Sequence, residues 1–418
     1  MSAFRRVLTM TLLSVLAAGC TKDLVCNTGE SACDGHCVNL SVDANNCSAC
    51  GHACPAGDTC QAGLCCQGGL CPAGLYVACS ASGEVQGATV NPIAPVGQAA
   101  SVPNAAALAW NQGTLWAVPD YVPSAAFELG TGLTGVSQVA EVLIPPGNSP
   151  NLVAVTANGG LLYVSDDETN SVVVVSPATS TGSPGIVGDV QGLPAAFPYG
   201  IAFAGGSGYI ALQNPNQIAV FDVAQQKVTT TIDLSQLGSA PGTGQPGKLL
   251  VVGERLYAAL LNLEPDFLGT AGDGLLAVID TSTNALATGV SPNPIDLGSA
   301  CQDPYGLALY GNTLYVTCGF LTAAGTVAGA AIVPVDISGP APVVQPALST
   351  AGLTPAAFFA PGPIAFCGNL GYVGDQQFGY VLRIDPAAGP SLTASQVPLC
   401  NPGPFGSYVG LADIQCAE

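Results

Sequence analysis

The chain has 418 residues and carries 27 Asp and Glu against 7 Lys and Arg, a formal net charge of −20 at pH 7. So acidic a protein repels nucleic-acid phosphates and anionic lipid headgroups, which argues against both as direct partners. Its 53 glycines and 33 prolines favour many short strands and turns over long helices, so the composition predicts an all-β fold.

The first twenty residues have the pattern of an export signal. Arg5 and Arg6 precede an apolar run over residues 7–16, and small residues follow before Cys20. The stretch Ala17-Ala-Gly-Cys20 resembles the lipobox of bacterial lipoproteins, in which the signal is cleaved and the new N-terminal cysteine carries lipid chains. An ordinary secretory signal, with Cys20 as one more cysteine, is the alternative.

The lipobox resemblance implies a signal peptide over residues 1–19, lipidation of Cys20 and a lipidated linker over residues 20–25. The acyl chains bury enough methylene groups, at about 0.8 kcal/mol each, to hold a domain stably at a membrane. Thr21 follows the cysteine in place of the aspartate that resembles an inner-membrane retention signal. We therefore expect a lipid-anchored protein of the cell envelope, at the outer membrane.

The cysteines divide the rest of the chain into two regions. Seventeen cysteines less a lipidated Cys20 leave sixteen, an even number that suits disulfides in an exported protein. Ten of them fall within residues 26–71, where few aliphatic residues are available to bury a core. We expect residues 26–71 to form a small module in which each disulfide contributes about 2–4 kcal/mol.

The middle of this module resembles a known repeat. Residues 37–60 resemble the cysteine-rich repeat of the stigma-specific protein family, whose Asn-Cys-Gly-x-Cys-Gly appears as Asn46-Cys-Ser-Ala-Cys-Gly51, with Ser48 replacing a glycine. The alternative is a zinc site, for which the ligands would be Cys47, Cys50, His52 and Cys54. The density of cysteine in an exported segment favours disulfides.

From residue 75 onward one pattern recurs: two apolar strands joined by a Gly or Asn turn, a polar loop, and a strand that closes on Asp. An aromatic residue marks each second strand, at Trp116, Tyr163, Tyr209, Tyr257, Tyr315 and Tyr372. The intervals run from 46 to 58 residues. A period in this range with about four short strands per copy is typical of a β-propeller blade. The copies resemble YVTN- and NHL-type propellers over residues 75–416.

Six copies are complete, and the chain ends supply a seventh. Residues 409–414 read as an innermost strand, whereas residues 75–79 and 84–90 read as strands that lack an innermost partner. Joining them would close the ring and remove exposed strand edges. We therefore predict an all-β fold in which a small disulfide-rich module precedes a seven-bladed β-propeller over residues 75–416.

Ring geometry also suggests how the six cysteines of the propeller pair. Cys301 precedes an innermost strand and Cys318 ends its antiparallel neighbour, so both should lie on one face within disulfide reach. Cys79 and Cys400 hold the equivalent places in the divided blade. This leaves Cys367 with Cys416, and the alternative is a bond between Cys79 and Cys416.

The propeller region offers little for catalysis. Its lack of histidine excludes a Ser-His-Asp triad or a histidine metal site, because the two histidines are His36 and His52. The loop acids Glu264, Asp266 and Asp273 could hold calcium through oxygen ligands, but their spacing fits no defined calcium loop, which favours solvated acids. We predict no catalytic residue, no metal and no cofactor.

Several polar residues precede or begin innermost strands, where a propeller opens its central channel. We take six of them as ligand-binding candidates: Asn104, Asn151, Tyr199, Lys248, Tyr305 and Tyr408. The alternative for the tyrosines is packing at the blade junctions. The predicted function is that of a non-catalytic surface lipoprotein whose propeller binds a protein or glycan partner. The alternative is a metal-dependent hydrolase of the lactonase type, which some propellers resemble.

Overall fold

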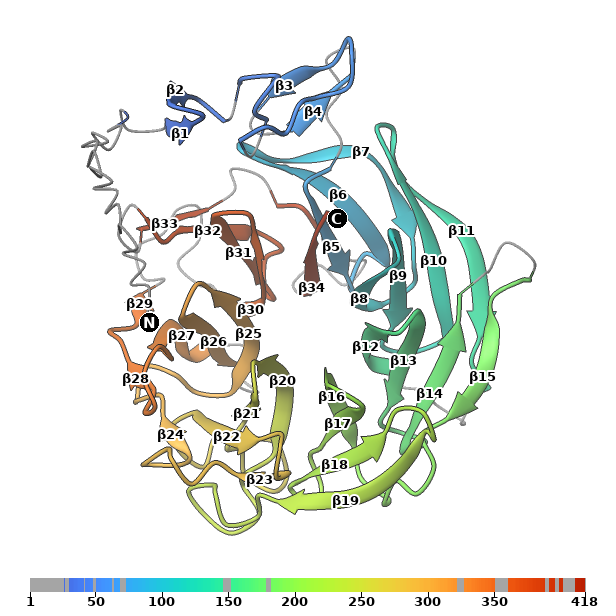
Figure 1. Cartoon of the computed structure of the whole chain (residues 1–418). Coiled ribbons are helices and arrows are strands. Elements are labelled where there is room, and N and C mark those ends of the chain that lie inside the picture. The colour runs from blue at the N-terminus through green and yellow to red at the C-terminus, as the bar shows by residue number, and fades with distance from the viewer. Residues whose placement is uncertain are drawn as a thin grey trace, which may run out of the picture. The chain divides into compact units, whose positions relative to one another are not determined.

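The computed structural model describes residues 26, 30–40, 42–47, 50–61, 64–67, 73–145, 152–177, 182–321, 327–349, 360–387, 391–394, 398–400 and 410–417. All the secondary-structure elements in these residues are β-strands (Figure 1). The chain divides into two compact units, residues 1–65 and 66–418. The prediction of an all-β chain with a disulfide-rich N-terminal region is confirmed. The expected signal peptide, Cys20 and the linker lie outside the described residues.

The N-terminal unit is built from short hairpins. Strand β1 (Ser31–Cys33) pairs with β2 (His36–Val38), and β3 (Thr59–Gln61) pairs with β4 (Leu64–Cys66). The turn of the first hairpin is Asp34-Gly35, and both residues have positive φ, 47° and 80°. This is the two-residue turn that Asp-Gly favours because glycine and aspartate tolerate the left-handed region.

Disulfides form the interior of this unit. Four are present among its described residues: Cys26–Cys37, Cys33–Cys50, Cys47–Cys60 and Cys54–Cys65. The sulfur-bearing residues Cys33, Cys47 and Cys60 are themselves buried. Cross-links thus replace the aliphatic core that the segment lacks.

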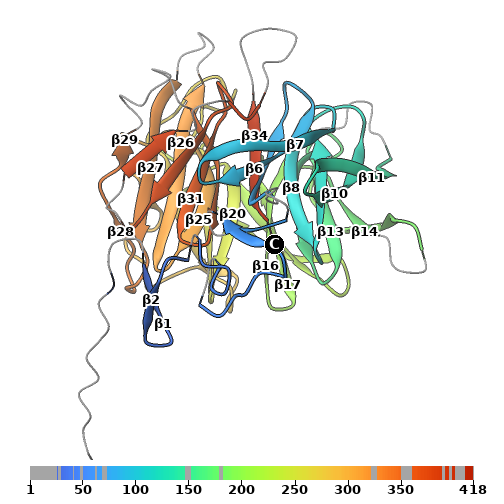
Figure 2. The same ribbon diagram turned by 90° about the horizontal axis from the view of Figure 1, so that it is seen from above.

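The C-terminal unit is organised around a ring of seven strands (Figures 1 and 2). These are β8 (Ala105–Asn111), β12 (Leu152–Asn158), β16 (Pro198–Ala204), β20 (Pro246–Val252), β25 (Pro304–Tyr310), β30 (Pro361–Cys367) and β34 (Leu411–Cys416). Each of them contacts the next, and β34 contacts β8, so the ring is closed. We call them the inner strands.

Each inner strand begins a sheet that continues outward through antiparallel neighbours (Figure 1). The outer strands are β5 (Leu75–Cys79), β6 (Glu84–Val90), β7 (Ile93–Ser101), β9 (Thr114–Pro119), β10 (Ala125–Gly132), β11 (Gly135–Leu143), β13 (Leu161–Asp166), β14 (Ser171–Ser176), β15 (Gly185–Asp189), β17 (Ser207–Leu212), β18 (Gln217–Asp222), β19 (Lys227–Asp233), β21 (Arg255–Leu260), β22 (Leu275–Asp280), β23 (Ala285–Leu286), β24 (Ile295–Asp296), β26 (Thr313–Leu321), β27 (Val327–Asp336), β28 (Val343–Val344), β29 (Leu348–Ser349), β31 (Leu370–Asp375), β32 (Val381–Asp385) and β33 (Ser391–Ala394). This arrangement is a β-propeller.

Two of the sheets are joined into one of eight strands, in the order β34-β5-β6-β7-β11-β10-β9-β8. The joint is a single parallel pair, Gly135 with Gln98. Gly135 has φ 118°, and a Cβ there would lie 2.2 Å from the backbone of Gln98, so the approach requires glycine. Dividing the sheet at this pair gives seven sets among the described strands, one for each inner strand, and we interpret each set as a blade.

The two ends of the C-terminal unit pair with each other. Strand β34 lies antiparallel to β5, with Leu411 opposite Cys79, and β5 continues into β6. The C-terminal strand is thus the inner strand of the set that begins the unit, as the sequence analysis expected. Pairing both ends leaves no open edge at the ring closure.

The recurring aromatic residues pack between neighbouring sheets. Trp116, Tyr163, Tyr209 and Tyr372 are fully buried. Tyr257, on β21, packs with residues of the following sheet such as Leu307 and Val316. The aromatic period of the sequence therefore marks positions that fill the space between blades.

The recurring aspartates shape turns. Asp280, Asp336 and Asp385 each accept the backbone N–H of the second residue after them, at 2.8, 2.9 and 3.1 Å, and Asp222 accepts that of Gln225 at 2.7 Å. These are Asx-type turns, so the recurring aspartates stabilise the turns at the ends of their strands. Among the described residues no helix is long and apolar enough to cross a membrane.

Candidate functional site

All seven inner strands share an irregularity near their first residue. In each, the pairing with the second strand shifts register within the first few residues, as between Leu152 and Ala154 in β12, Pro304 and Gly306 in β25, and Leu411 and Asp413 in β34. A bulge bends a strand and re-aims its side chains. The start of each inner strand is therefore freed from regular pairing and can present residues to the centre of the ring.

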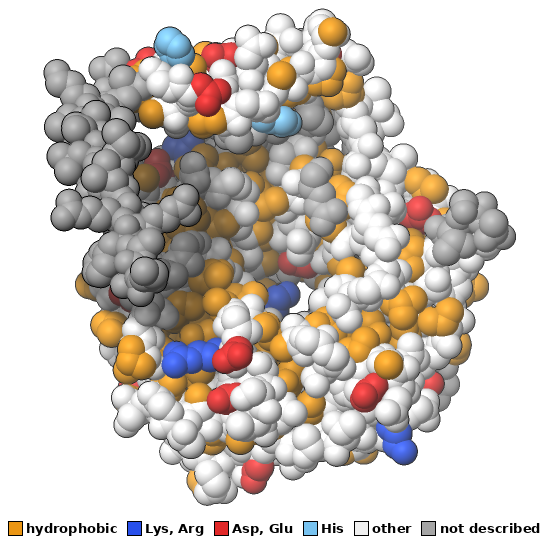
Figure 3. Space-filling view, viewed as in Figure 1, with side chains coloured by type: hydrophobic (Ala, Val, Ile, Leu, Met, Phe, Trp, Pro, Cys, Tyr) orange, Lys and Arg blue, Asp and Glu red, His pale blue; other side chains and the backbone are white. Residues whose placement is uncertain are grey.

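A pocket of about 160 Å³ occupies this centre. Every inner strand contributes to its wall, and the residues are Ala106, Ala107, Val153, Ala154, Tyr199, Gly200, Lys248, Tyr305, Gly306, Leu307, Pro363, Ile364, Ala365, Ala412, Asp413, Ile414 and Gln415. Figure 3 shows the hollow in the ring, with basic and acidic side chains inside it. Small apolar residues with a few convergent polar groups are the usual make-up of a ligand site.

One lysine and one aspartate are the charged residues of this wall, Lys248 on β20 and Asp413 on β34. The Asp413 carboxylate is buried and accepts backbone N–H groups from Leu108, at 2.7 Å to Oδ2, and Ile414, at 2.8 Å to Oδ1. Burial raises the pKa of Asp413, and the nearby charge of Lys248 and these hydrogen bonds oppose that rise. Asp413 is thus held in place by the backbone of two neighbouring inner strands.

Two tyrosines extend across the same pocket. The Tyr305 hydroxyl donates to the carbonyl oxygen of Ala412, at 3.2 Å, and the side chains of Tyr199 and Tyr305 are hydrogen-bonded to each other. The chain of contacts links β16, β25 and β34. Burial, followed by the charge of Asp303, raises the pKa of Tyr199 well above its usual range. The Tyr199 phenol is therefore neutral at physiological pH.

Buried hydroxyl groups on the second strands of two blades donate hydrogen bonds to the first residues of neighbouring inner strands. The buried Ser165 hydroxyl, on β13, donates to the Tyr199 carbonyl oxygen at 2.9 Å. Thr317, on β26, is fully buried and donates in the same way to the Gly362 carbonyl oxygen. These hydroxyls satisfy carbonyl groups that the bulges leave without a ladder partner.

The six ligand-binding candidates have different locations. Tyr199, Lys248 and Tyr305 line the pocket. Asn104 does not line it: the residue precedes β8 with φ 51°, and its carbonyl oxygen accepts the N–H of Asp120 at 2.9 Å. Asn151 and Tyr408 lie outside the described residues. Tyr199 and Tyr305 line the pocket and also form hydrogen bonds between inner strands. Contacts between blades, the alternative given for the tyrosines, are therefore part of their role.

Two acidic residues near the pocket, Asp413 and Asp303, are not among the candidates that the sequence analysis predicts. Asp413 is the one acid within its inner strand, a signal that was available at residues 409–414. Asp303 directly precedes Pro304 and Tyr305 at the start of β25, and burial raises its pKa to about 7. Asp303 is half-buried, and partial loss of water around its carboxyl group favours the neutral form.

The propeller cysteines form three disulfides. They are Cys79–Cys400, Cys301–Cys318 and Cys367–Cys416, with Cα–Cα distances of 5.4, 5.1 and 5.3 Å. These are the pairs that ring geometry favoured, and Cys79 is not bonded to Cys416. Cys79–Cys400 joins residues 321 positions apart at the ring closure.

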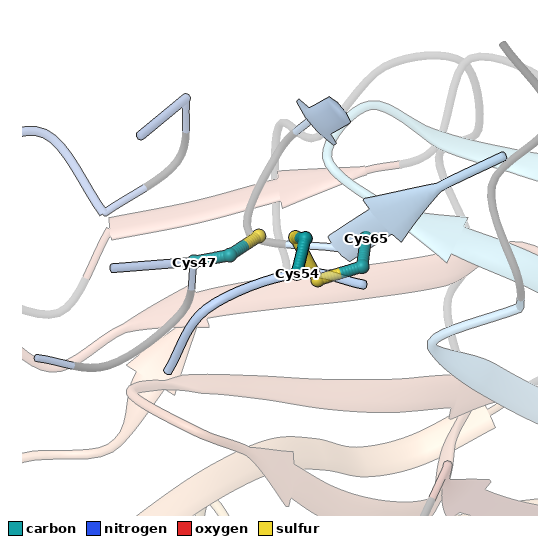
Figure 4. A group of neighbouring side chains, drawn as sticks. All are labelled: Cys47, Cys54 and Cys65. Carbon is teal, nitrogen blue, oxygen red and sulfur yellow. A yellow bond between two sulfur atoms is a disulfide. The ribbon is translucent and has the colours of Figure 1, made fainter. Parts of the chain in front are cut away.

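Three cysteine side chains, which are of a type that can bind metal ions, lie close together in the N-terminal unit. The sulfur atoms of Cys47, Cys54 and Cys65 lie within 4.8 Å of one another, but each belongs to a disulfide (Figure 4). Cys50 is bonded to Cys33. A zinc site at Cys47, Cys50, His52 and Cys54 is therefore wrong, because a disulfide sulfur is no thiolate ligand.

The loop acids do not form a cluster either. In the described part of the propeller, no three acidic side chains lie close enough together to share an ion. Asp266 instead accepts the backbone N–H of Leu268 at 3.0 Å. The calcium alternative for Glu264, Asp266 and Asp273 has no support in this geometry.

Comparisons with known proteins agree with the division of the chain. The sequence model of the Stigma-specific STIG1-like protein family matches residues 14–68. A search among curated proteins by sequence found no match.

Solved structures match the propeller at low sequence identity. A protein from Lactobacillus plantarum has a TM-score of 0.60 at 14% identity, over 82% of this chain and 99% of that one. A putative 6-phosphogluconolactonase from Bacteroides fragilis has a TM-score of 0.59 at 12% identity, over 82% and 97%. The periplasmic gluconolactonase of Pseudomonas aeruginosa has a TM-score of 0.55 at 15% identity, over 81% and 99%.

At such identities the similarity establishes the fold alone. The chain combines a cysteine-rich segment that matches the STIG1-like family model with a β-propeller.

Proposed function

We propose that this protein is a non-catalytic binding protein of the cell envelope, whose propeller takes a protein or glycan partner at its central channel. The observation that carries the proposal is the pocket to which all seven inner strands contribute, with Lys248, Tyr199 and Tyr305 in its wall. Its remaining wall is mostly small and apolar, which suits binding of an inserted group.

The chemistry of the pocket supports binding more than turnover. Burial raises the pKa of Tyr199, and the Tyr305 hydroxyl donates to the Ala412 carbonyl oxygen, so neither phenol is activated as a nucleophile. The Asp413 carboxylate is fixed between β8 and β34 by one backbone N–H on each oxygen, which gives it a structural role.

A lactonase-type hydrolase is the second candidate, because the fold is shared with the two lactonase structures. Such an activity would require a metal held by oxygen ligands near the channel mouth. Among the described residues, Asp120 and Asp303 near Tyr199 belong to no close group of three acidic side chains. This candidate therefore depends on further ligands such as Asn151.

The membrane anchor belongs to the same proposal. A lipid on Cys20 would hold the chain at the outer membrane, and the cysteine-rich module would be a protease-resistant spacer. The support is the lipobox resemblance and the disulfides among the described residues of the module. Disulfide-dense segments keep their structure in an oxidising compartment.

The test compares partner retention with hydrolysis. The detergent-extracted full chain is used to capture partners from its own envelope and is applied to a glycan array, beside the Tyr305→Phe and Lys248→Met variants. We expect a partner on the wild-type chain that both variants retain poorly. Stoichiometric metal in the purified protein, with lactone hydrolysis that a chelator abolishes, would establish the second candidate instead.

A further inference from the structure

Lys248 has an unusual position in the pocket. It is half-buried in the wall, and among the described residues its ammonium group forms no hydrogen bond and no ion pair. Lysine side chains in a partly dry site need acceptors, because three N–H donors lose water there. The pocket wall contains no other lysine or arginine.

Asp413 is not the hydrogen-bond acceptor of Lys248. It is close enough for the Lys248 charge to act on it, yet its oxygens accept the backbone N–H groups of Leu108 and Ile414. A cationic ligand beside this carboxylate would also meet the charge of Lys248. An anionic ligand would find the Lys248 donors available, so the free hydrogen-bonding capacity of the pocket favours an anion.

The size of the pocket limits the ligand. Its volume of about 160 Å³ is close to that of a cavity of about 150 Å³ that holds one benzene molecule. Sites for larger ligands measure about 300–1,000 Å³. One six-membered ring therefore fits, and the phenols of Tyr199 and Tyr305 place hydroxyl groups beside it, as hydroxyl-rich sugars require.

We infer that the central pocket binds one uronic acid residue of a glycan, with the Lys248 ammonium as the counter-ion of its carboxylate. The inference rests on the proposed binding function and names its ligand class. A ring with hydroxyl groups uses the phenols and the small apolar wall together, whereas an acidic peptide side chain would use Lys248 alone. Since the chain has a net charge of −20, its overall field opposes anions, and attraction is local to Lys248.

The experiment titrates the full chain with glucuronate, glucose and N-acetylglutamate by calorimetry. Wild type is compared with Lys248→Met, with Lys248→Arg, and with Lys227→Met as a control, since Lys227 is an exposed lysine on β19. We expect glucuronate to bind at least about tenfold more tightly than glucose. That preference should disappear in Lys248→Met and persist in Lys248→Arg and Lys227→Met. Thermal unfolding of each variant shows that it is folded.

Each other outcome overturns the inference in a distinct way. Equal binding of glucose and glucuronate, or full glucuronate affinity in Lys248→Met, would remove Lys248 as the counter-ion while a binding function survives. Tighter binding of N-acetylglutamate would indicate an acidic protein partner instead. If no probe binds but an envelope partner is still captured through the channel, the ligand class is wrong and the proposed function stands. If neither occurs, both fail.

Discussion

Lys248 and Asp413 line one pocket from β20 and β34, two inner strands that are not neighbours in the ring. The lysine charge opposes the rise that burial imposes on the pKa of the aspartate. The electrostatic environment of Asp413 thus includes a lysine that the ring closure brings near. The pair connects the closure of the propeller with the chemistry of its centre.

The Asp413→Asn variant tests the support that this carboxylate gives to β8 and β34. An amide has one acceptor oxygen, so the N–H of either Leu108 or Ile414 loses its partner, at a cost of about 1–3 kcal/mol. Asp336→Asn is the control, because an asparagine oxygen can still accept the N–H of Ser338 in that exposed turn. Urea unfolding measures both, and equal losses would contradict the role assigned to Asp413.

Asp303 predicts a pH dependence of stability. Its pKa is about 7 in the folded protein, raised by burial from an ordinary value of 3.8. Between these values the folded state binds more protons at this site than the unfolded state, so the contribution of Asp303 to stability falls as pH rises through this window. The Asp303→Asn variant has no titrating carboxyl group at this position and so does not lose this contribution to stability as the pH rises. Its stability relative to wild type should therefore increase from pH 4.5 to pH 7.5, measured by urea unfolding, whereas a constant difference would rule out the burial effect.

The Cys79–Cys400 disulfide should stabilise the ring closure. Replacing both cysteines by alanine removes a bond that spans 321 positions, and the chain-entropy relation predicts a loss in unfolding free energy of at least about 5 kcal/mol. Cys301–Cys318 closes a separation of 17 residues and provides the comparison. Loop-closure entropy predicts the smaller loss for this shorter loop. Denaturant unfolding that ranks the two pairs in the opposite order would refute the entropic account.

Tyr305→Phe should weaken the contact between β25 and β34. The variant removes the hydroxyl that donates to the Ala412 carbonyl and that is bonded to Tyr199, and the expected cost is about 0.5–1.5 kcal/mol. Tyr121→Phe is the matched control, since Tyr121 is 56% exposed. Unchanged stability of both variants would mean that water replaces the Tyr305 hydroxyl without cost.

Cys20→Ser tests the proposed anchor. Without a thiol at this position no thioether to lipid can form, and we expect the protein to leave the membrane fraction. Mass spectrometry of the N-terminal peptide of the wild-type protein should show an acylated cysteine. An unmodified Cys20 in that peptide would support the ordinary secretory signal.

Much of the architecture can be predicted from the sequence because it depends on local periodicity. The aromatic residues at Trp116, Tyr163 and Tyr209 repeat once per blade, since each fills the same space between sheets. The recurring aspartates at strand ends hydrogen-bond within a few residues of themselves, so their role also follows from local sequence. Cysteine pairing in the propeller follows once the blades are aligned, because it depends on equivalent positions within a repeat.

The pocket could not be derived in the same way. Lys248 and Asp413 belong to repeats far apart in the chain, and neither position recurs with the same charge. Their meeting depends on the number of inner strands in the ring and on the bulge that turns each strand start toward the centre. The sequence by itself determined the two-part organisation, the repeat and the sites of cross-linking. Only the tertiary structure decided which side chains face one another, because the pocket exists only when all seven inner strands close around it.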